Sequence, residues 1–206
     1  MNEHVDIVDF GKALFLRPKI FFQKYFNEYT QPSFFPVVLS VFCIAYGIGR
    51  LDYMLKPGGF GDHWLSFWGI AIAAGALGGY LVYLIAGWFY NVRLTWSEGT
   101  SDISTSRNLY LYTGSISAVG VIISTLVNFL VKENPSDHVS IYYSLATIFF
   151  LMFFSFYSII ISFYGVVTIT NADHKKARIW FLIVPMVCYA IVYFRILWSL
   201  FSYLQD

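Results

Sequence analysis

The sequence predicts an all-helical membrane protein with five transmembrane helices, preceded by one or two interfacial amphipathic helices. The 206 residues are 58% hydrophobic and 12% charged, and their mean hydropathy is +0.62. Soluble domains are about 45–50% apolar and about 25% charged. Long apolar stretches with short polar loops between them fill almost all of the chain after Ser33. Because a membrane-spanning helix needs about 20 apolar residues, these stretches leave little sequence for a soluble domain.

Residues 1–32 form a first segment, which we expect to lie on the cytoplasmic membrane surface. Apolar residues recur there with broadly helical spacing, and Pro18 divides them into two short helices at about 5–16 and 18–27. The interspersed basic residues are Lys12, Arg17, Lys19 and Lys24. A basic amphipathic helix can lie in the headgroup layer, where anionic lipids add about 1 kcal/mol per basic residue. The alternative is a short helix packed on the cytoplasmic ends of the bundle, and both arrangements can hold together.

Residues 33–206 form the predicted transmembrane domain, which contains five continuous apolar runs. The predicted spans lie at about 34–49, 64–90, 109–131, 141–168 and 179–204. Helices are the reasonable spanning element, because barrel strands would alternate in polarity over about 10 residues. Pro185 lies about one turn inside the fifth span, where its missing N–H predicts a kink.

The distribution of Lys and Arg between alternate loops predicts the orientation in the membrane. One side holds nine such residues, namely Lys12, Arg17, Lys19, Lys24, Arg93, Arg107, Lys175, Lys176 and Arg178. The other side holds three, namely Arg50, Lys56 and Lys132. Cytoplasmic loops of membrane proteins carry the excess of Lys and Arg. We therefore expect a cytoplasmic N-terminus and a non-cytoplasmic C-terminus.

Small residues and hydroxyl groups are expected to select the helix partners, because lipid tails are as apolar as leucine side chains. Gly75 and Gly79 have four-residue spacing in the second span, and the fourth span carries Ser155, Ser158 and Ser162 on one face. We expect these residues to pack against other helices. A polar pathway lined by hydroxyl groups is the alternative. The glycine stripe either closes the monomer or joins two copies.

Two polar residues within the predicted spans are candidates for an intramembrane polar site. Arg195 falls well inside the fifth span, where an arginine costs about 2.5–3.5 kcal/mol on insertion scales. It is expected either to contact an anion or lipid headgroup, or to snorkel and form a local ion pair. Asn128 lies late in the third span and is expected to form an interhelical hydrogen bond.

No motif in the sequence indicates catalysis, and we expect no enzymatic activity, no cofactor and no metal. The sequence has no nucleophile elbow, no HExxH motif and no phosphate-binding glycine loop. Its four histidines share no metal-type spacing, and Cys43 and Cys188 both lie in apolar runs. The net charge of +1 gives no reason to expect nucleic-acid binding. The expected partners are membrane lipids, together with a second copy or another membrane protein.

A diffuse set of short motifs covers most of the chain. The motifs are Arg17-Pro18-Lys19 before the first span, Gly78, Gly79, Tyr80 and Gly87 in the second, Tyr110, Tyr112 and Gly114 in the third, and Lys175, Lys176 and Ala177 ahead of Pro185. In these motifs and in its five predicted spans, the chain resembles the Yip1 family. The compact form, without the Tyr-Gly-Pro type motif of eukaryotic members, is similar to bacterial members. The resemblance implies a five-span fold with a cytoplasmic N-terminus, here in a bacterial inner membrane.

Two functions stay open at the level of the sequence. The first is a non-enzymatic scaffold that organises partner proteins or local bilayer shape. The second is a transporter or channel that moves a small solute or lipid along a cavity lined by Ser, Thr and Arg195. A transporter predicts a continuous polar cavity that reaches the membrane midplane. A scaffold predicts that the serines are buried in helix contacts.

Overall fold

The protein is helical throughout the residues that the computed structural model describes, which are 7–26, 34–51, 64–100, 102–131 and 137–203. No strand occurs within these ranges, so the predicted all-helical fold is confirmed. The N-terminal elements are α1 (Ile7–Leu16), α2 (Pro18–Ile20) and the π-helix η1 (Phe21–Tyr25). The bundle consists of α4 (Phe35–Leu51), α5 (Trp64–Trp96), α6 (Ile103–Val131), α7 (Asp137–Ile169), α8 (His174–Arg178), the π-helix η3 (Ile179–Ile183) and α9 (Val184–Tyr203).

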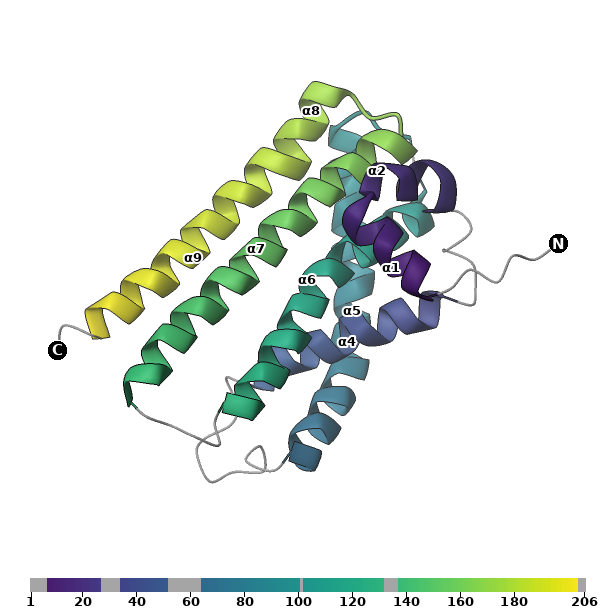
Figure 1. Cartoon of the computed structure of the whole chain (residues 1–206). Coiled ribbons are helices and arrows are strands. Elements are labelled where there is room, and N and C mark those ends of the chain that lie inside the picture. Colours follow the sequence, from purple (N-terminus) through teal and green to yellow (C-terminus); the bar gives the residue numbers. More distant parts are fainter. Residues whose placement is uncertain (1–6, 27–33, 52–63, 101, 132–136, 204–206) are drawn as a thin grey trace.

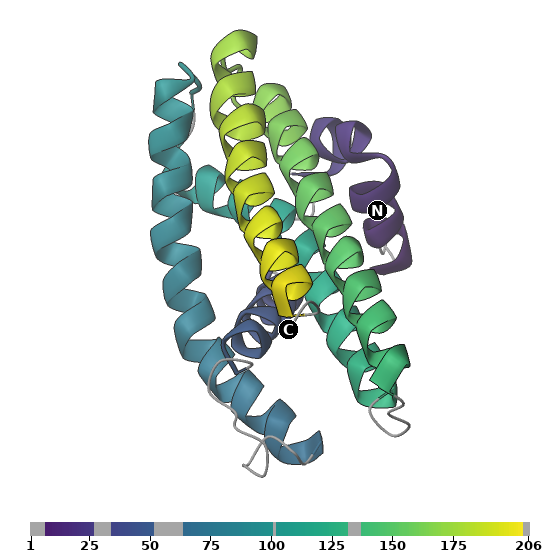
Figure 2. The same ribbon diagram turned by 90° about the vertical axis from the view of Figure 1, so that its left-hand side faces the viewer.

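Four segments of the described chain are long and apolar enough to cross a membrane. They are Leu65–Trp96, Ile103–Val127, Leu145–Ile169 and His174–Ser202. The last of these is a continuous rod made of α8, η3 and α9, drawn from light green to yellow in Figures 1 and 2. The apolar helix Phe35–Gly49 is shorter. It belongs to α4, which crosses α5 at a steep angle in Figure 1 and packs against both α5 and α6.

Glycine allows the close approach of α4 and α5. A Cβ added at Gly75 would lie 2.8 Å from the carbonyl carbon of Cys43, and one at Gly79 would lie 2.8 Å from the Cα of Cys43. From the other side, a Cβ added at Gly47 would lie 2.8 Å from the carbonyl carbon of Ala71. Small residues let two backbones pack this closely in a membrane. The structure therefore places Gly75 and Gly79 in a contact between two helices of the same chain.

The N-terminal helices pack along the outside of α7, where both ribbon views show them in purple (Figures 1 and 2). Leu14, Phe21 and Phe22 are buried in the main apolar core. The Tyr157 hydroxyl of α7 donates a hydrogen bond to the carbonyl of Phe15. The inner face of this segment therefore packs against the bundle.

Helix α5 continues past residue 90, where the sequence predicted the span to end and a polar loop to begin. It ends in a Schellman motif, in which the Glu98 N–H donates to the Thr95 carbonyl and the Gly99 N–H to the Leu94 carbonyl, both at 3.0 Å. Glu98 has a φ of 57° there, in the left-handed region that favours glycine. The polar residues before this motif stay helical because the bundle provides contacts for them, among them the aromatic rings around Arg93.

Helix α6 begins earlier than predicted, directly after Asp102. The Asp102 carboxylate accepts a hydrogen bond from the Thr105 N–H at 2.6 Å, as an N-cap residue does. The same bond holds the pKa of this carboxyl below its ordinary value. The Ser/Thr-rich stretch before the third span thus ends in a helix cap.

Candidate functional site

A partly open cavity of about 160 Å³ lies between α4, α5, α6, α7 and the rod formed by η3 and α9. Its polar lining consists of Tyr90, Arg93, Tyr110, Thr113, Ser117, Ser158, Ser162 and Tyr189. Its apolar lining consists of Phe42, Gly114, Ile159, Phe181 and Pro185. Arg93 is the charged residue among them, and no described residue of the lining carries a carboxylate. We refer to this space as the Arg93 cavity.

Arg93 lies in the last turn of α5, and aromatic rings surround its guanidinium group. The guanidinium carbon lies 4.8 Å from the ring centre of Phe181, 5.1 Å from that of Tyr90 and 5.5 Å from that of Phe89. Nη1 donates a long hydrogen bond of 3.5 Å to the carbonyl of Trp180. Nε is buried and has no hydrogen-bond partner among the described residues. The rings attract the cation by about 0.5–2 kcal/mol, but they do not neutralise its charge.

Three hydroxyl groups of the cavity donate to carbonyls of their own helix. Thr113 donates to the Leu109 carbonyl at 2.8 Å, Ser117 to the Gly114 carbonyl at 2.9 Å, and Ser158 to the Ser155 carbonyl at 2.9 Å. Such bonds satisfy a hydroxyl within its own helix. The hydroxyl donors of these three side chains are therefore satisfied within their own helices.

The tyrosines of the cavity differ from these residues. The Tyr90 hydroxyl forms a 2.9 Å hydrogen bond with Ser162 and thereby joins α5 to α7. Tyr110 and Tyr189 also line the cavity, and no hydrogen bond to either hydroxyl is found within the described part of the chain. A phenolic O–H is a good donor. Two donors are thus available beside Arg93.

The predicted serine face of α7 is divided between packing and the cavity. Ser158 and Ser162 line the Arg93 cavity. Ser155 is buried and forms a 2.8 Å hydrogen bond with the Tyr193 hydroxyl, which joins α7 to α9. The three residues thus lie on the face that contacts other helices, and two of them also border the open space.

Of the two predicted intramembrane polar residues, Arg195 can be placed relative to this cavity. Arg195 is exposed on α9 and does not line the Arg93 cavity. Asn128 lies near the end of α6, and its side chain falls outside the described residues. Among the residues that the structure describes, no three His, Cys, Asp or Glu side chains lie together as a metal ion would require.

The basic residues of the N-terminal segment lie on its outer face. Lys12, Arg17, Lys19 and Lys24 are all exposed. Two large apolar side chains accompany them, with Leu16 75% and Ile20 45% exposed. We call these six residues the basic outer face. It combines positive charge with apolar area on the side of the segment that faces away from the bundle.

A second polar arrangement joins the turn between α5 and α6 to the turn between α7 and α8. The Thr100 N–H donates to the Thr170 carbonyl at 2.8 Å, and the Asp173 N–H donates to the Ser97 carbonyl at 2.8 Å. A Cβ added at Gly99 would lie 2.9 Å from the Thr170 hydroxyl, so the turns lie in close contact. We call this arrangement the turn clasp.

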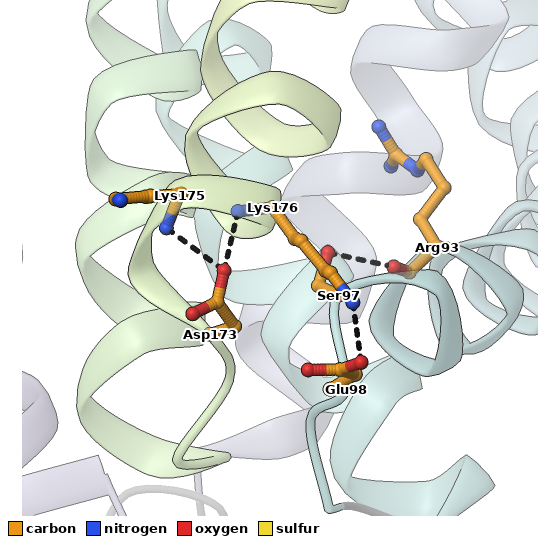
Figure 3. A network of polar contacts seen from close by, with 6 residues as sticks. All are labelled: Arg93, Ser97, Glu98, Asp173, Lys175 and Lys176. Atoms are coloured by element: carbon orange, nitrogen blue, oxygen red, sulfur yellow. Dashed lines mark hydrogen bonds and ion pairs between the residues drawn. The ribbon is translucent and has the colours of Figure 1, made fainter.

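Side chains extend the turn clasp on both sides (Figure 3). Lys176 forms an ion pair with Glu98, and the Asp173 carboxylate caps α8 by accepting from the N–H groups of Lys175 and Lys176 at 3.1 and 2.8 Å. Ser97 donates to the Arg93 carbonyl at 2.9 Å. The clasp is therefore bonded directly to the residue that carries the charge of the cavity.

The sequence does not identify Arg93 as a cavity residue, because the predicted second span ends at residue 90 and leaves Arg93 among the loop residues that set the orientation. One signal could have found it. Phe89 and Tyr90 precede it by four and three residues, a spacing that places side chains on one helix face. Arg107 also has a buried Nε without a hydrogen-bond partner in the described residues, but it packs against Gly87 and does not line the cavity.

The comparisons with known proteins agree with the resemblance seen in the sequence motifs. The family model of the Yip1 domain matches residues 12–195, a range that includes Arg93 and most of the helical bundle. No curated protein and no solved structure matches the chain. With four apolar helices long enough to cross a membrane, this protein is an integral membrane protein and belongs to the Yip1 domain family.

Proposed function

We propose that this protein is a non-enzymatic scaffold that organises lipids and partner proteins at the cytoplasmic surface of a bacterial inner membrane. The observation that carries the proposal is the basic outer face, where four cationic and two apolar side chains are exposed on helices fixed to the bundle. Such a combination favours the headgroup layer, because cations attract anionic lipids and apolar side chains enter the acyl boundary.

The packing of the N-terminal segment holds the basic outer face in a fixed conformation before any lipid binds. Leu14, Phe21 and Phe22 hold the inner side against the bundle, so the basic residues are displayed without a separate ordering step. Preorganisation of this kind lowers the entropy cost of binding. Each basic residue near an anionic surface contributes about 1 kcal/mol. The face is therefore suited to hold anionic lipids beside α7.

The proposed topology has five membrane-inserted helices, with α4 as the first. Its 17 residues lie at the lower end of the about 17–25 residues that a span needs. The Lys/Arg distribution then gives a cytoplasmic N-terminus and a non-cytoplasmic C-terminus. This orientation puts the turn clasp and α8 on the cytoplasmic side. A second copy or another membrane protein would contact the apolar surface of α9, where Val187, Ile191 and Phe194 are exposed.

Vesicles with and without anionic lipid test this function. The full chain is placed in vesicles of phosphatidylcholine alone or with phosphatidylglycerol, and hydrogen exchange of residues 7–26 and vesicle diameter are measured. We expect phosphatidylglycerol to slow the exchange. The double variant Arg17→Gln/Lys19→Gln loses about 2 kcal/mol of this attraction, by the value of about 1 kcal/mol per basic residue.

The matched control is Lys175→Gln/Arg178→Gln, which removes two exposed charges from α8 at the same side of the membrane. We expect this control to keep the slowed exchange. The proposal fails if exchange of residues 7–26 is the same in both lipids, or if the two double variants behave alike.

A transport function is the second candidate, and the Arg93 cavity is the observation that favours it. The cavity contains Ser158 and Ser162, as the transporter hypothesis requires, but its arginine is Arg93 and not Arg195. Two assays in reconstituted vesicles test transport. One measures the flux of phosphate into the vesicles, and the other measures the flux of a fluorescent lipid across their membrane. Transport predicts that Arg93→Gln abolishes the flux and that Arg195→Gln leaves it intact. Flux no greater than that of empty vesicles contradicts transport.

A further inference from the structure

We propose that the Arg93 cavity is a binding site for a phosphate group. This inference does not depend on the scaffold function, since the basic outer face and the cavity share no residue. It also requires no passage across the membrane, so it differs from transport. The charge balance is the first argument. Among the described residues that line the cavity, Arg93 is the one cation, and none carries a carboxylate.

An arginine in this position needs an anion. Arg93 is enclosed by Phe89, Tyr90 and Phe181, and it makes no ion pair with any described residue. A charge away from water is costly unless a counter-charge and hydrogen bonds accompany it. The guanidinium carbon lies over these three rings, 4.8–5.5 Å from their centres. Nε is buried and has no hydrogen-bond partner in the described part of the chain.

The donor set fits a phosphate group. The guanidinium fork of Arg93 matches two oxygens of a phosphate in a bidentate arrangement. Tyr110 and Tyr189 line the same space and each carries a further O–H donor. Ser158 and Ser117 donate to their own helices, and rotation about one bond would turn either hydroxyl toward a ligand. A volume of about 160 Å³ holds several water-sized groups, which suffices for phosphorus and its oxygens.

The depth of the site also favours this chemistry. Trp96 and Trp180 lie beside Arg93 with their ring centres 4.6 Å apart, and Trp180 supplies the carbonyl that Nη1 contacts. Trp is enriched where a bilayer meets water, which is also the level of the lipid phosphates. Arg93 is therefore at the depth where a lipid headgroup would present its phosphate. A phosphate ion from the aqueous side would reach the same level.

The π-helix η3 supplies one wall of the cavity. The Val184 N–H donates to the Ile179 carbonyl, and the widened turn carries Phe181, which is 1% exposed and lies against Arg93. Pro185, which also lines the cavity, has no N–H to donate to the Phe181 carbonyl. Single π turns occur often at functional sites. The π-helix η3 thus continues the helix between α8 and α9 and also positions Phe181 in the wall of the cavity.

Ligand-induced stabilisation tests the proposal with the full chain in a nonionic, phosphate-free detergent. The midpoint of thermal unfolding is measured with short-chain phosphatidylglycerol, with diacylglycerol of the same chain length, and with inorganic phosphate. A ligand that binds the folded state raises this midpoint. We expect phosphatidylglycerol to raise it and diacylglycerol, which lacks the phosphate, to leave it unchanged.

Arginine variants locate the effect. Arg93→Gln should weaken phosphatidylglycerol binding at least about tenfold, because a charge-assisted bidentate contact is lost. Arg93→Lys keeps the charge without the fork and should bind with intermediate strength. Arg178→Gln removes an exposed charge from α8 and should bind as the wild type does. If Arg93→Gln does not fold, Tyr189→Phe at the cavity edge replaces it and should weaken binding severalfold.

The arms of the experiment distinguish the sources of the phosphate. A rise with phosphatidylglycerol alone identifies a lipid headgroup, and an Arg93-dependent rise with inorganic phosphate identifies a free anion. Equal effects of phosphatidylglycerol and diacylglycerol, together with no Arg93-dependent rise with inorganic phosphate, overturn the proposal. So does binding that Arg93→Gln and Arg178→Gln weaken equally, or that Tyr189→Phe leaves unchanged where Arg93→Gln does not fold. The scaffold proposal fails by a different result, the exchange behaviour of residues 7–26.

Discussion

Gly75 of α5 lies against the main chain of α4 at Cys43, with no room for a side chain between the two helices. A Cβ at this position would meet the Cys43 carbonyl carbon at 2.8 Å. The contact is one of backbone against backbone, which neither helix can relieve by moving a flexible side chain. Because hydrophobicity does not drive helix association in a membrane, such packing has a large share in holding α4 in place.

Gly75→Ala should therefore destabilise the protein by about 1–3 kcal/mol, the usual cost of overpacking a core. Gly69→Ala on the same helix is the matched control, since nothing lies within 4 Å of a Cβ built there. The control should be neutral or slightly stabilising, because alanine favours a helix over glycine by up to about 1 kcal/mol. Thermal unfolding in detergent measures both. Equal midpoints for the two variants would contradict the close α4–α5 contact.

The hydrogen bond of 2.8 Å between Ser155 and Tyr193 joins α7 to α9. Tyr193→Phe should lower the free energy of unfolding by about 0.6 kcal/mol and at most about 1.7 kcal/mol, the range for such bonds within membranes. Tyr164→Phe, on the exposed part of α7, should have no effect. In a double-mutant cycle, Ser155→Ala should add little to Tyr193→Phe. Full additivity of the two changes would show that this bond contributes nothing.

At Glu98, a strained backbone lowers the stability of the fold and an ion pair raises it. Its φ of 57° costs a non-glycine residue about 1–2 kcal/mol, whereas its exposed ion pair with Lys176 contributes at most about 1 kcal/mol. Glu98→Gly should therefore stabilise the protein slightly, although the ion pair is lost. Glu98→Gln loses the ion pair and keeps the strained backbone, so it should be slightly destabilising. The midpoints of thermal unfolding of the two variants test this expectation. A lower midpoint for Glu98→Gly than for Glu98→Gln would refute the strain argument.

The pKa of Asp102 lies below its ordinary value because its carboxylate accepts the Thr105 N–H at the start of α6. A lowered pKa in the folded state means that the charged form stabilises the fold. This stabilisation is complete above the unfolded-state pKa of about 3.9 and is lost as the pH falls through the folded-state value. Asp102→Asn keeps a cap that does not titrate. The unfolding midpoint of the wild type should thus fall relative to that of Asp102→Asn as the pH is lowered from 5 to about 3; parallel curves would exclude the effect.

The approximate positions of the long apolar helices could be predicted from the lengths of the apolar stretches alone, since a helix must reach a minimum length to cross a bilayer. The residues at which the helices begin and end could not be predicted in this way. Residues 91–96 read as a polar loop, yet they continue α5 because aromatic rings from η3 and α5 surround Arg93. Contacts between segments far apart in sequence, such as the bond between Arg93 and Trp180, leave no periodic signal. Likewise, the position of Arg195 in a long apolar run is visible in the sequence, whereas its exposure on α9 is not.

The two bonds at the centre of the turn clasp use main-chain atoms, from Thr100 to Thr170 and from Asp173 to Ser97. Amide and carbonyl groups are present whichever side chain a residue carries. Mutation can therefore replace most side chains in both turns while the junction persists, provided that position 99 stays small. Distant members of the family could share this junction after their turn sequences have diverged beyond alignment, so it should be sought in coordinates and not in sequence motifs.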